Sequence, residues 1–291
     1  MIPAHTFVGA DDAPRLGFVL HGVLGAGHNF RSFIKRLTEV RPEYRFVLID
    51  LRNHGKSTPA PPPHTLESAA DDLLDLAASL GRDPDVVIGH SLGGKVALTF
   101  ARRHVEPREL RRPSPAAHGK LDQVWALDSD PGPQVAGSSH QVRQVMAALR
   151  AHPGPFATRA EVIERIMNEG LSSGLANWLS TNLERREDKF FWRLELDAID
   201  ELLDDYFDAD LWGFLNELAA GSEKLERPLP HVHLLVAENS DRWSGSMKEH
   251  ALALPASENF TLHELADSGH WVHVDNPDGL LEFLSTHLPS C

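Results

Sequence analysis

Hydrophobic and polar positions follow two different periods through the first hundred residues. Residues 17–20, 46–49 and 86–88 form short continuous apolar runs, which are typical of buried strands. Residues 29–40 and 66–80 lie between these runs and carry apolar side chains at helical spacing. Strands that alternate with helices indicate βαβ units. The sequence therefore predicts an α/β protein whose mostly parallel central sheet is flanked by helices.

The pattern changes after residue 102. Residues 102–120 contain five Arg and three Pro, and they predict an irregular surface insertion before a further strand at 124–127. From about residue 140 to residue 225 no strand pattern occurs, and this stretch carries nine of the 21 aromatic residues. The alternation then resumes, with predicted strands at 231–237 and 260–265 and predicted helices at 246–254 and 277–288.

These changes predict one core that is interrupted once by a cap. We expect the α/β core to comprise residues 1–139 and 226–291, and an all-helical cap to comprise residues 140–225. A chain of 291 residues is long enough to bury a large core without disulfide bonds.

The segment Gly89-His90-Ser91-Leu92-Gly93 follows a predicted strand and opens a predicted helix at 94–104. In this context G-x-S-x-G is typical of a nucleophile elbow, a turn so tight that glycines are needed two positions before and after the serine. The sequence therefore predicts that Ser91 is a nucleophile. The alternative interpretation is a Gly-rich turn that carries an incidental serine.

A second glycine-rich loop, His21-Gly22-Val23-Leu24-Gly25, follows the first predicted strand. A loop at this place can offer backbone N–H groups to an oxyanion that develops during acyl transfer. We expect the N–H groups of Val23 and Leu92 to form this oxyanion hole.

The base and the acid of such a site follow the nucleophile in the chain, in the order Ser, then Asp or Glu, then His. Of the 17 histidines, His270 lies in the loop between the last predicted strand and the last predicted helix, so we predict that it is the base. Asp128 and Asp241 each follow a predicted strand and precede His270. The residues alone leave both open as the carboxylate that orients the imidazole. His273 is expected to be a cap or packing residue.

Composition excludes several classes of partner and cofactor. The chain has 28 basic and 42 acidic residues, a net charge of −14, which repels nucleic acid and anionic membranes. No apolar run is long enough to span a bilayer. Cys291 is the only cysteine, and His231 and His233 lack the carboxylate spacing of a metal site, so we expect no disulfide, metal or cofactor. We expect a soluble intracellular protein, in the cytoplasm or, if a transit peptide has been removed, in an organelle.

Three segments together carry a family resemblance: Asp50-Leu51-Arg52-Asn53-His54-Gly55-Lys56-Ser57, Gly89-His90-Ser91-Leu92-Gly93-Gly94-Lys95 and Gly269-His270-Trp271-Val272-His273. They resemble the α/β-hydrolase superfamily over nearly the whole chain. Within it they are similar to the small acyl-ester hydrolases that include YbfF-type esterases and mitochondrial abhydrolase-domain relatives. The resemblance implies an acid on the strand before the cap, and so favours Asp128 over Asp241. Ser129-Asp130-Pro131-Gly132 departs from the group's pattern, and the longer cap leaves the substrate range open.

The expected function is that of a serine hydrolase that cleaves a small acyl ester or thioester through an acyl-enzyme. Because the base must be neutral, we expect activity to fall at acid pH. Ser91 excludes the hydrolases that use an Asp nucleophile at the elbow. A thioesterase, a C–C bond hydrolase or lyase with the same triad, and a non-catalytic ligand-binding protein with the same fold remain alternatives. The oligomeric state is left open.

The remaining expectations concern substrate binding. The aromatic residues of the cap predict an apolar pocket, unless most of these rings pack the cap's own core. The arginines of the 102–120 insertion are expected to form a solvated surface loop. The alternative is that they bind a phosphorylated substrate; they are Arg102, Arg103, Arg108, Arg111 and Arg112.

Overall fold

The computed structural model describes residues 1–106, 120–134, 140–225, 228–243, 245–254 and 257–290. Its centre is a seven-stranded sheet with the order β1-β3-β2-β4-β5-β8-β9. Six strands are parallel, and β1 pairs antiparallel with β3 at one edge. The strands are β1 (His5–Val8), β2 (Arg15–Leu20), β3 (Tyr44–Ile49), β4 (Val86–His90), β5 (Gln123–Leu127), β8 (His231–Ala237) and β9 (Phe260–Leu265). The predicted mostly parallel α/β sheet is confirmed, and β1 is an addition.

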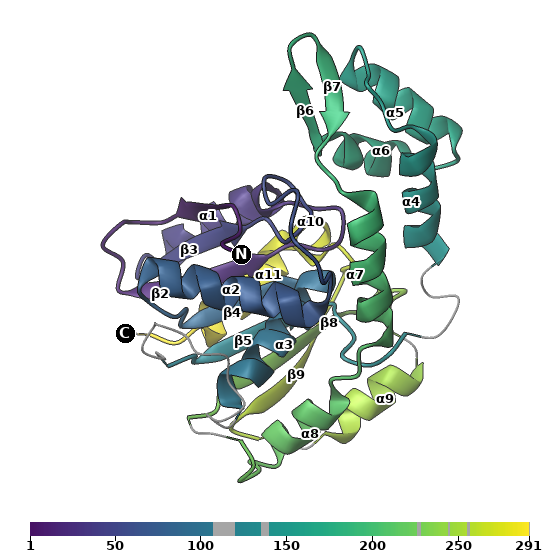
Figure 1. The fold of residues 1–291 in the computed structure, drawn as a ribbon. Helices are drawn as coiled ribbons and strands as arrows, with labels where there is room; N and C mark the ends of the chain where they lie inside the picture. The colour runs from purple at the N-terminus through teal and green to yellow at the C-terminus, as the bar shows by residue number, and fades with distance from the viewer. Residues whose placement is uncertain (107–119, 135–139, 226–227, 244, 255–256, 291) are drawn as a thin grey trace.

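Helices cover both faces of the sheet (Figure 1). The core helices are α1 (Arg31–Val40), α2 (Leu66–Leu80), α3 (Leu92–Val105), α8 (Trp212–Ala219), α9 (Gly245–Ala253), α10 (Val272–Asp275) and α11 (Pro277–His287), with a short 3₁₀ turn, η1 (Gly27–Phe30). Successive side chains of one strand point to opposite faces of the sheet and pack in different hydrophobic clusters. In β2, Phe18 packs with α2 and α3, and its neighbour Val19 packs with α1 and α11. Both faces are therefore buried, which explains the continuous apolar runs of the strands.

Local capping fixes the bounds of the helices that the sequence predicted. Thr65 caps α2 by accepting a hydrogen bond from the Ser68 N–H at 3.1 Å, and Gly81 ends the helix with a φ of +67°. Asn276 caps α11 in the same way, through the Gly279 N–H at 2.9 Å. These side-chain signals are why the predicted and observed bounds of α2 agree.

The chain leaves the core after β5 and builds a cap from α4 (His140–Ala151), α5 (Arg159–Asn168), α6 (Ser173–Ser180), β6 (Leu183–Arg186), β7 (Lys189–Trp192) and α7 (Leu196–Asp208). The hairpin β6–β7 stands at the outer end of the cap (Figure 1). The prediction of an all-helical cap is therefore wrong. The sequence did not predict the hairpin, because its strands have only four residues each and its first strand ends in the charged Arg185 and Arg186. The chain then returns through α8, which packs against β9.

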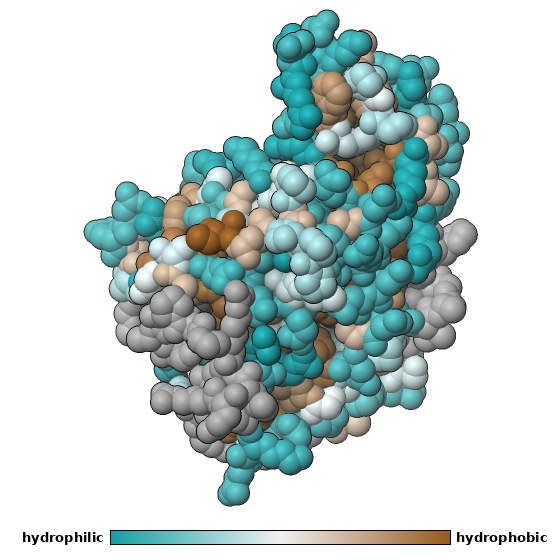
Figure 2. Space-filling view, viewed as in Figure 1, coloured by the Kyte–Doolittle hydropathy of each residue, from teal (hydrophilic) through white to brown (hydrophobic). Residues whose placement is uncertain are grey.

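The surface is mostly hydrophilic on the face drawn in Figure 2, and hydrophobic residues are visible on the cap within a hydrophilic rim. Most of the arginine-rich insertion, including Arg108, Arg111 and Arg112, lies outside the described residues. Arg102 and Arg103 both form ion pairs with Glu67 of α2. Across the described ranges, no helix is both long and apolar enough to cross a lipid bilayer.

Candidate active site

Ser91 stands at the sharp turn between β4 and α3. Its backbone has a φ of +52° and a ψ of −118°, a conformation that is strained for a residue with a side chain. A Cβ at Gly89 would lie 2.0 Å from the Gly93 oxygen, and one at Gly93 would lie 2.6 Å from the His21 oxygen. Only glycine fits at both positions. The turn therefore holds Ser91 at the N-terminus of α3, as the G-x-S-x-G pattern predicts.

His270 and Asp128 are joined by a short hydrogen bond. The His270 Nδ1–H donates to Asp128 Oδ2 at 2.7 Å, and the Asp128 side chain is completely buried. The same carboxylate accepts hydrogen bonds from Ser240 Oγ at 2.6 Å and from the Ala237 N–H at 3.1 Å. Three donors therefore hold the carboxylate in one orientation. The structure thus brings together two of the predicted residues, 142 positions apart in the chain.

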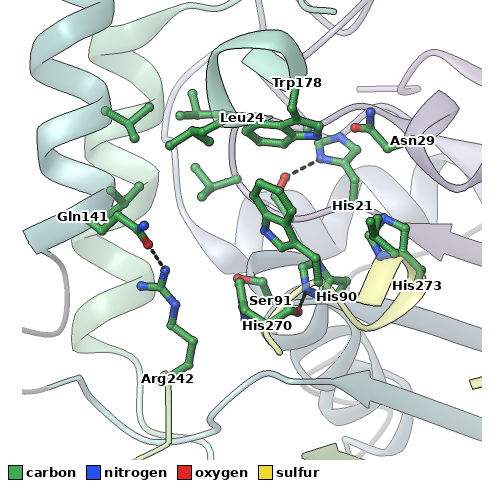
Figure 3. Close-up of a pocket in the computed structure, with 18 of the residues that line it drawn as sticks. His21, Leu24, Asn29, His90, Ser91, Gln141, Trp178, Arg242, His270 and His273 are labelled. Carbon is green, nitrogen blue, oxygen red and sulfur yellow. Dashed lines mark hydrogen bonds between the residues drawn. The ribbon is translucent and has the colours of Figure 1, made fainter. Parts of the chain in front are cut away.

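Asp241, the other candidate acid, lies elsewhere. Its side chain is 74% exposed and pairs with the Arg242 guanidinium, with Oδ1 3.1 Å from Nε. Arg242 also donates to Gln141 of α4, across one wall of the cavity (Figure 3). Of the two carboxylates, only Asp128 contacts His270.

His90, inside the predicted motif, positions the loop that carries His270. Its Nε2–H donates to the backbone oxygen of His270 at 2.7 Å, and the two rings lie 4.7 Å apart. Burial lowers the pKa of His90 well below its usual value, so the ring is neutral. On its other side, His273 stacks on Phe30 with ring centroids 4.0 Å apart. The sequence predicted no role for His90, because the G-x-S-x-G pattern specifies only the two glycines and the serine around it.

The Gly22–Val23 peptide is held in one orientation. The Gly22 oxygen accepts hydrogen bonds from the Gly25 N–H at 3.0 Å and from His21 Nδ1 at 2.7 Å. In a trans peptide the N–H points away from the carbonyl, so these bonds turn the Val23 N–H to the opposite side. The loop lies against the nucleophile, because a Cβ at Gly22 would be 3.3 Å from Ser91 Cβ.

His21 acts as the support of this loop. Its Nε2 accepts the Leu51 N–H at 2.9 Å, and burial lowers the pKa of His21 to about 4. The ring is therefore neutral, with its proton on Nδ1. Among the described residues, no acceptor contacts the N–H of Val23 or of Leu92. Val23 and Leu92 therefore stay the predicted oxyanion donors.

The segment from Asp50 to Ser57 forms a scaffold beside this loop. Asp50 accepts hydrogen bonds from the Gly27 N–H at 2.8 Å and the Lys56 N–H at 2.9 Å. Gly55 has a φ of +54°, and a Cβ there would lie 2.3 Å from the Asp50 carboxylate. Arg52 pairs with the buried Asp72 of α2. The segment that carries most of the resemblance is therefore a structural support rather than part of the reacting groups.

Tyr206 of α7 brings a cap hydroxyl to the nucleophile. Burial raises the pKa of Tyr206, and the nearby Asp130 raises it further while the Ser91 side chain lowers it, so the phenol stays protonated. Gln134 Nε2 donates to the same hydroxyl at 3.2 Å. Sequence reasoning missed this residue because a tyrosine within a helical pattern has the signature of a core residue.

Ser91 and His270 both line a cavity of about 420 Å³ between core and cap, and both are labelled in the close-up (Figure 3). This volume is typical of small-molecule sites. The walls are largely apolar side chains: Val142, Val145, Leu175, Trp178, Leu203, Phe207, Trp271 and Val274. Of the nine aromatic residues between 140 and 225, three line the cavity, and most of the others pack in the hydrophobic core, as the alternative interpretation expected.

A second cluster of histidines lies along β8 and β9. The rings of His231 and His233 stack 4.2 Å apart, and His233 Nδ1 is 2.9 Å from His263 Nε2. Within the described part of the chain, no group of three or more His, Cys, Asp or Glu residues has the arrangement of a metal site. These histidines pack with Trp125, whose ring stacks on His233.

The arrangement has two of the parts that acyl transfer requires: a hydroxyl in a strained turn and an imidazole oriented by a buried carboxylate. The sequence profile described as the Alpha/beta hydrolase family matches residues 18–283. Similar proteins include the sn-1-specific diacylglycerol lipase ABHD11 of Mus musculus, which is 27% identical over 92% of this chain and 79% of the relative. The esterase YbfF of Escherichia coli (strain K12) is 24% identical over 93% and 91%. Among solved structures, a marine microorganism esterase has a TM-score of 0.77 and 23% identity, with 99% of both chains covered.

Proposed function

The chain belongs to the alpha/beta hydrolase family, and from this premise we propose that it hydrolyses acyl esters with Ser91 as nucleophile, His270 as base and Asp128 as orienting acid. One observation carries the proposal: His270 Nδ1 lies 2.7 Å from the buried Asp128 carboxylate, at the floor of the cavity that Ser91 also lines. Relatives that are an esterase and a diacylglycerol lipase support ester hydrolysis as the reaction.

The bond between His270 and Asp128 fixes the tautomer of the imidazole. With the proton on Nδ1, Nε2 is free to accept the Ser91 proton as Oγ attacks the acyl carbonyl. The N–H groups of Val23 and Leu92 then stabilise the oxyanion. His270 returns the proton to the leaving alcohol, and a water molecule that His270 activates releases the acyl group from Ser91.

The cavity favours a substrate with an apolar acyl chain. Its cap wall is lined by Val145, Leu175 and Trp178, and burying a chain against such side chains contributes about 0.8 kcal/mol per methylene. A thioester fits the same mechanism, since the acyl carbonyl is attacked in both cases. We therefore propose small acyl esters, with acyl thioesters as the second substrate class.

A chain-length series of p-nitrophenyl esters tests the mechanism on the wild type and three variants. We expect Ser91→Ala and Asp128→Ala to lose roughly 10³-fold or more in kcat. Asp241→Ala is the matched control and should stay within about twofold of wild type, because its exposed carboxylate does not reach His270. An active Asp128→Ala together with an inactive Asp241→Ala would overturn the assignment of the acid.

Mass spectrometry tests whether Ser91 is the residue that forms the covalent intermediate. An alkyl fluorophosphonate should label Ser91 in the wild type and leave Ser91→Ala unlabelled. The same ester series repeated with matched S-acyl thioesters decides between the two substrate classes, by comparison of kcat/KM.

A further inference from the structure

Leu24 has a backbone conformation that it does not prefer. Its φ is +59°, in the left-handed region, although it is not glycine and its side chain is buried. It directly follows Val23, whose N–H is an oxyanion donor in the proposed mechanism. A strained residue persists only where neighbouring groups hold it in place. The contacts of Leu24 therefore decide whether the oxyanion loop keeps its shape.

Two side chains hold the backbone of Leu24 from opposite sides. The N–H of Leu24 donates to His54 Nε2 at 3.0 Å, and its oxygen accepts a hydrogen bond from Asn182 Nδ2 at 2.6 Å. His54 Nδ1 donates to the Arg52 oxygen at 2.9 Å, so Nε2 keeps its lone pair. Burial lowers the pKa of His54 to about 3, and the ring stays a neutral acceptor at neutral pH. One support thus comes from the core and the other from the cap.

Asn182 is unusual because its amide is only half satisfied. The residue is fully buried between α6 and β6, and its Oδ1 has no hydrogen-bond partner among the described residues. A buried amide oxygen without a partner is destabilising, and an apolar side chain of similar size would avoid this penalty. Folding stability therefore does not account for an asparagine here. Its one side-chain hydrogen bond goes to Leu24.

The backbone next to Asn182 also ties the cap to the scaffold that holds His54. The Asn182 oxygen accepts the Arg193 N–H at 2.9 Å. One residue further on, Leu194 forms an antiparallel bridge with His54. The base of the cap hairpin, the 50–57 scaffold and the oxyanion loop are thus linked by hydrogen bonds. A shift of the cap would remove the donor from the Leu24 oxygen and the bridge from His54 together.

We propose that Asn182 is a positioning residue, which holds the Leu24 carbonyl so that the oxyanion loop presents the Val23 N–H only while the cap is seated on the core. The inference rests on the proposed function. An oxyanion forms only in the transition state, so the loss of this support lowers kcat and leaves substrate binding almost unchanged.

Asn182→Leu tests the proposal, with Asp205→Leu as the matched control. Asp205 of α7 also makes a cap–core hydrogen bond, to the Leu66 N–H at 2.7 Å, but away from the oxyanion loop. We expect kcat of Asn182→Leu to fall about 10- to 100-fold with KM within about twofold, less than the loss of a complete oxyanion donor. The inhibition constant of an alkyl trifluoromethyl ketone, which forms a tetrahedral adduct, should rise by the same factor as kcat/KM falls. Asp205→Leu should leave both values near wild type.

The thermal midpoint separates positioning from simple stability. Asn182→Leu removes an unpartnered buried oxygen but also takes the donor from the Leu24 carbonyl, so the two effects oppose each other and the midpoint should stay within a few degrees of the wild type while kcat falls. An unchanged kcat in the folded variant, or a rise in KM alone, would overturn the proposal. If Asn182→Leu does not fold, Asn182→Ala replaces it, since the smaller apolar side chain also has no N–H to donate. A wild-type kcat in that variant would overturn the proposal as well.

Variants of His54 test the proposal independently of Asn182. His54→Gln retains an acceptor, and His54→Phe removes it, so kcat should be higher in the first variant than in the second. Equal values in the two folded variants would contradict the role of the Leu24 N–H contact. If the wild type neither hydrolyses esters nor reacts with fluorophosphonate, the proposed function itself is refuted. If the wild type is active and Asn182→Leu has the same kcat, only the positioning role is refuted.

Discussion

At the scale of single residues, the proposed acid of the site, Asp128, depends on neighbours that the sequence pattern does not mark. Asp128 has a φ of +45°, and its carboxylate is held by Ser240 and Ala237 as well as by His270. Such supporting bonds restrict the carboxylate to one orientation, and with it the imidazole. Ser240, in the loop after β8, thus contacts the Asp128 carboxylate, whereas the neighbouring Asp241 does not contact His270.

Ser240→Ala should therefore reduce kcat/KM about tenfold, because the carboxylate loses one of the donors that fix it, a change of about 1.4 kcal/mol. The measurement is steady-state kinetics with one p-nitrophenyl ester. Ser240→Thr keeps the hydroxyl and should recover most of the activity. Equal activity of the Ala variant and the wild type would show that the other donors suffice.

Asp128→Asn isolates the orienting role of the acid. The amide has nearly the same shape, but its NH₂ group favours the opposite imidazole tautomer, so kcat should fall about 10³- to 10⁴-fold. The variant should remain folded by circular dichroism. A loss of less than about tenfold would contradict the assignment.

At the scale of elements, a buried lysine joins the helix that follows the nucleophile to the cap. Lys95 of α3 is fully buried, and its Nζ donates to the oxygens of Gly132 and Tyr206 at 2.7 Å and of Ala209 at 3.1 Å. Two of these carbonyls lie at the C-terminal end of α7, where helix carbonyls lack partners and a cation is favourable. Burial lowers the pKa of Lys95 to about 8, against the attraction of nearby carboxylates, of which Asp130 contributes most.

Lys95→Met should lower the free energy of unfolding by about 3 kcal/mol, because three buried carbonyls lose their donor. Urea denaturation measures this change. The stem of Lys95 is retained in the methionine, so packing loss does not explain the effect. A variant as stable as the wild type would mean that water or the neighbouring helix replaces the ammonium.

Sequence reasoning succeeded at this scale where the signal was local. The cap of α2 and the motif around Ser91 depend on residues that are neighbours in the sequence, and the loop after the last strand brings His270 to the cavity that Ser91 also lines. The hairpin β6–β7 was missed because its charged residues hide the alternation. Asn182 and Tyr206 were missed because their contacts join segments far apart in the chain, which no local pattern records.

At the scale of the whole molecule, several buried or half-buried histidines are in the neutral form. Burial lowers the pKa of His21, His263 and His273 to about 4 and that of His54 to about 3. Between these values and the ordinary pKa of about 6.5, the unfolded chain binds protons that the folded chain does not. Stability therefore falls as the pH drops below about 6.5. Asp130 acts in the opposite sense, since burial raises its pKa to about 6.

The free energy of unfolding should consequently decrease between pH 6.5 and 4 by about 1.4 kcal/mol per pH unit for each such histidine. The double variant His233→Phe/His263→Phe removes two of the buried imidazoles and both partners of one hydrogen bond. Its stability should depend less steeply on pH, by up to two protons. Urea denaturation at several pH values measures the slope, and an identical slope in both proteins would disprove the interpretation.

The position of the cap in the chain has a consequence for biosynthesis. Strands β5 and β8 are neighbours in the sheet, although about a hundred residues of cap lie between them in the chain. A ribosome that adds about 5 to 20 residues per second needs roughly 5 to 20 seconds to synthesise that stretch. During this interval β5 is an edge strand of an incomplete sheet. Its unpaired N–H and C=O groups can form hydrogen bonds with strands of other nascent chains. Chaperone binding to the emerging polypeptide is needed most at this moment, before β8 leaves the exit tunnel.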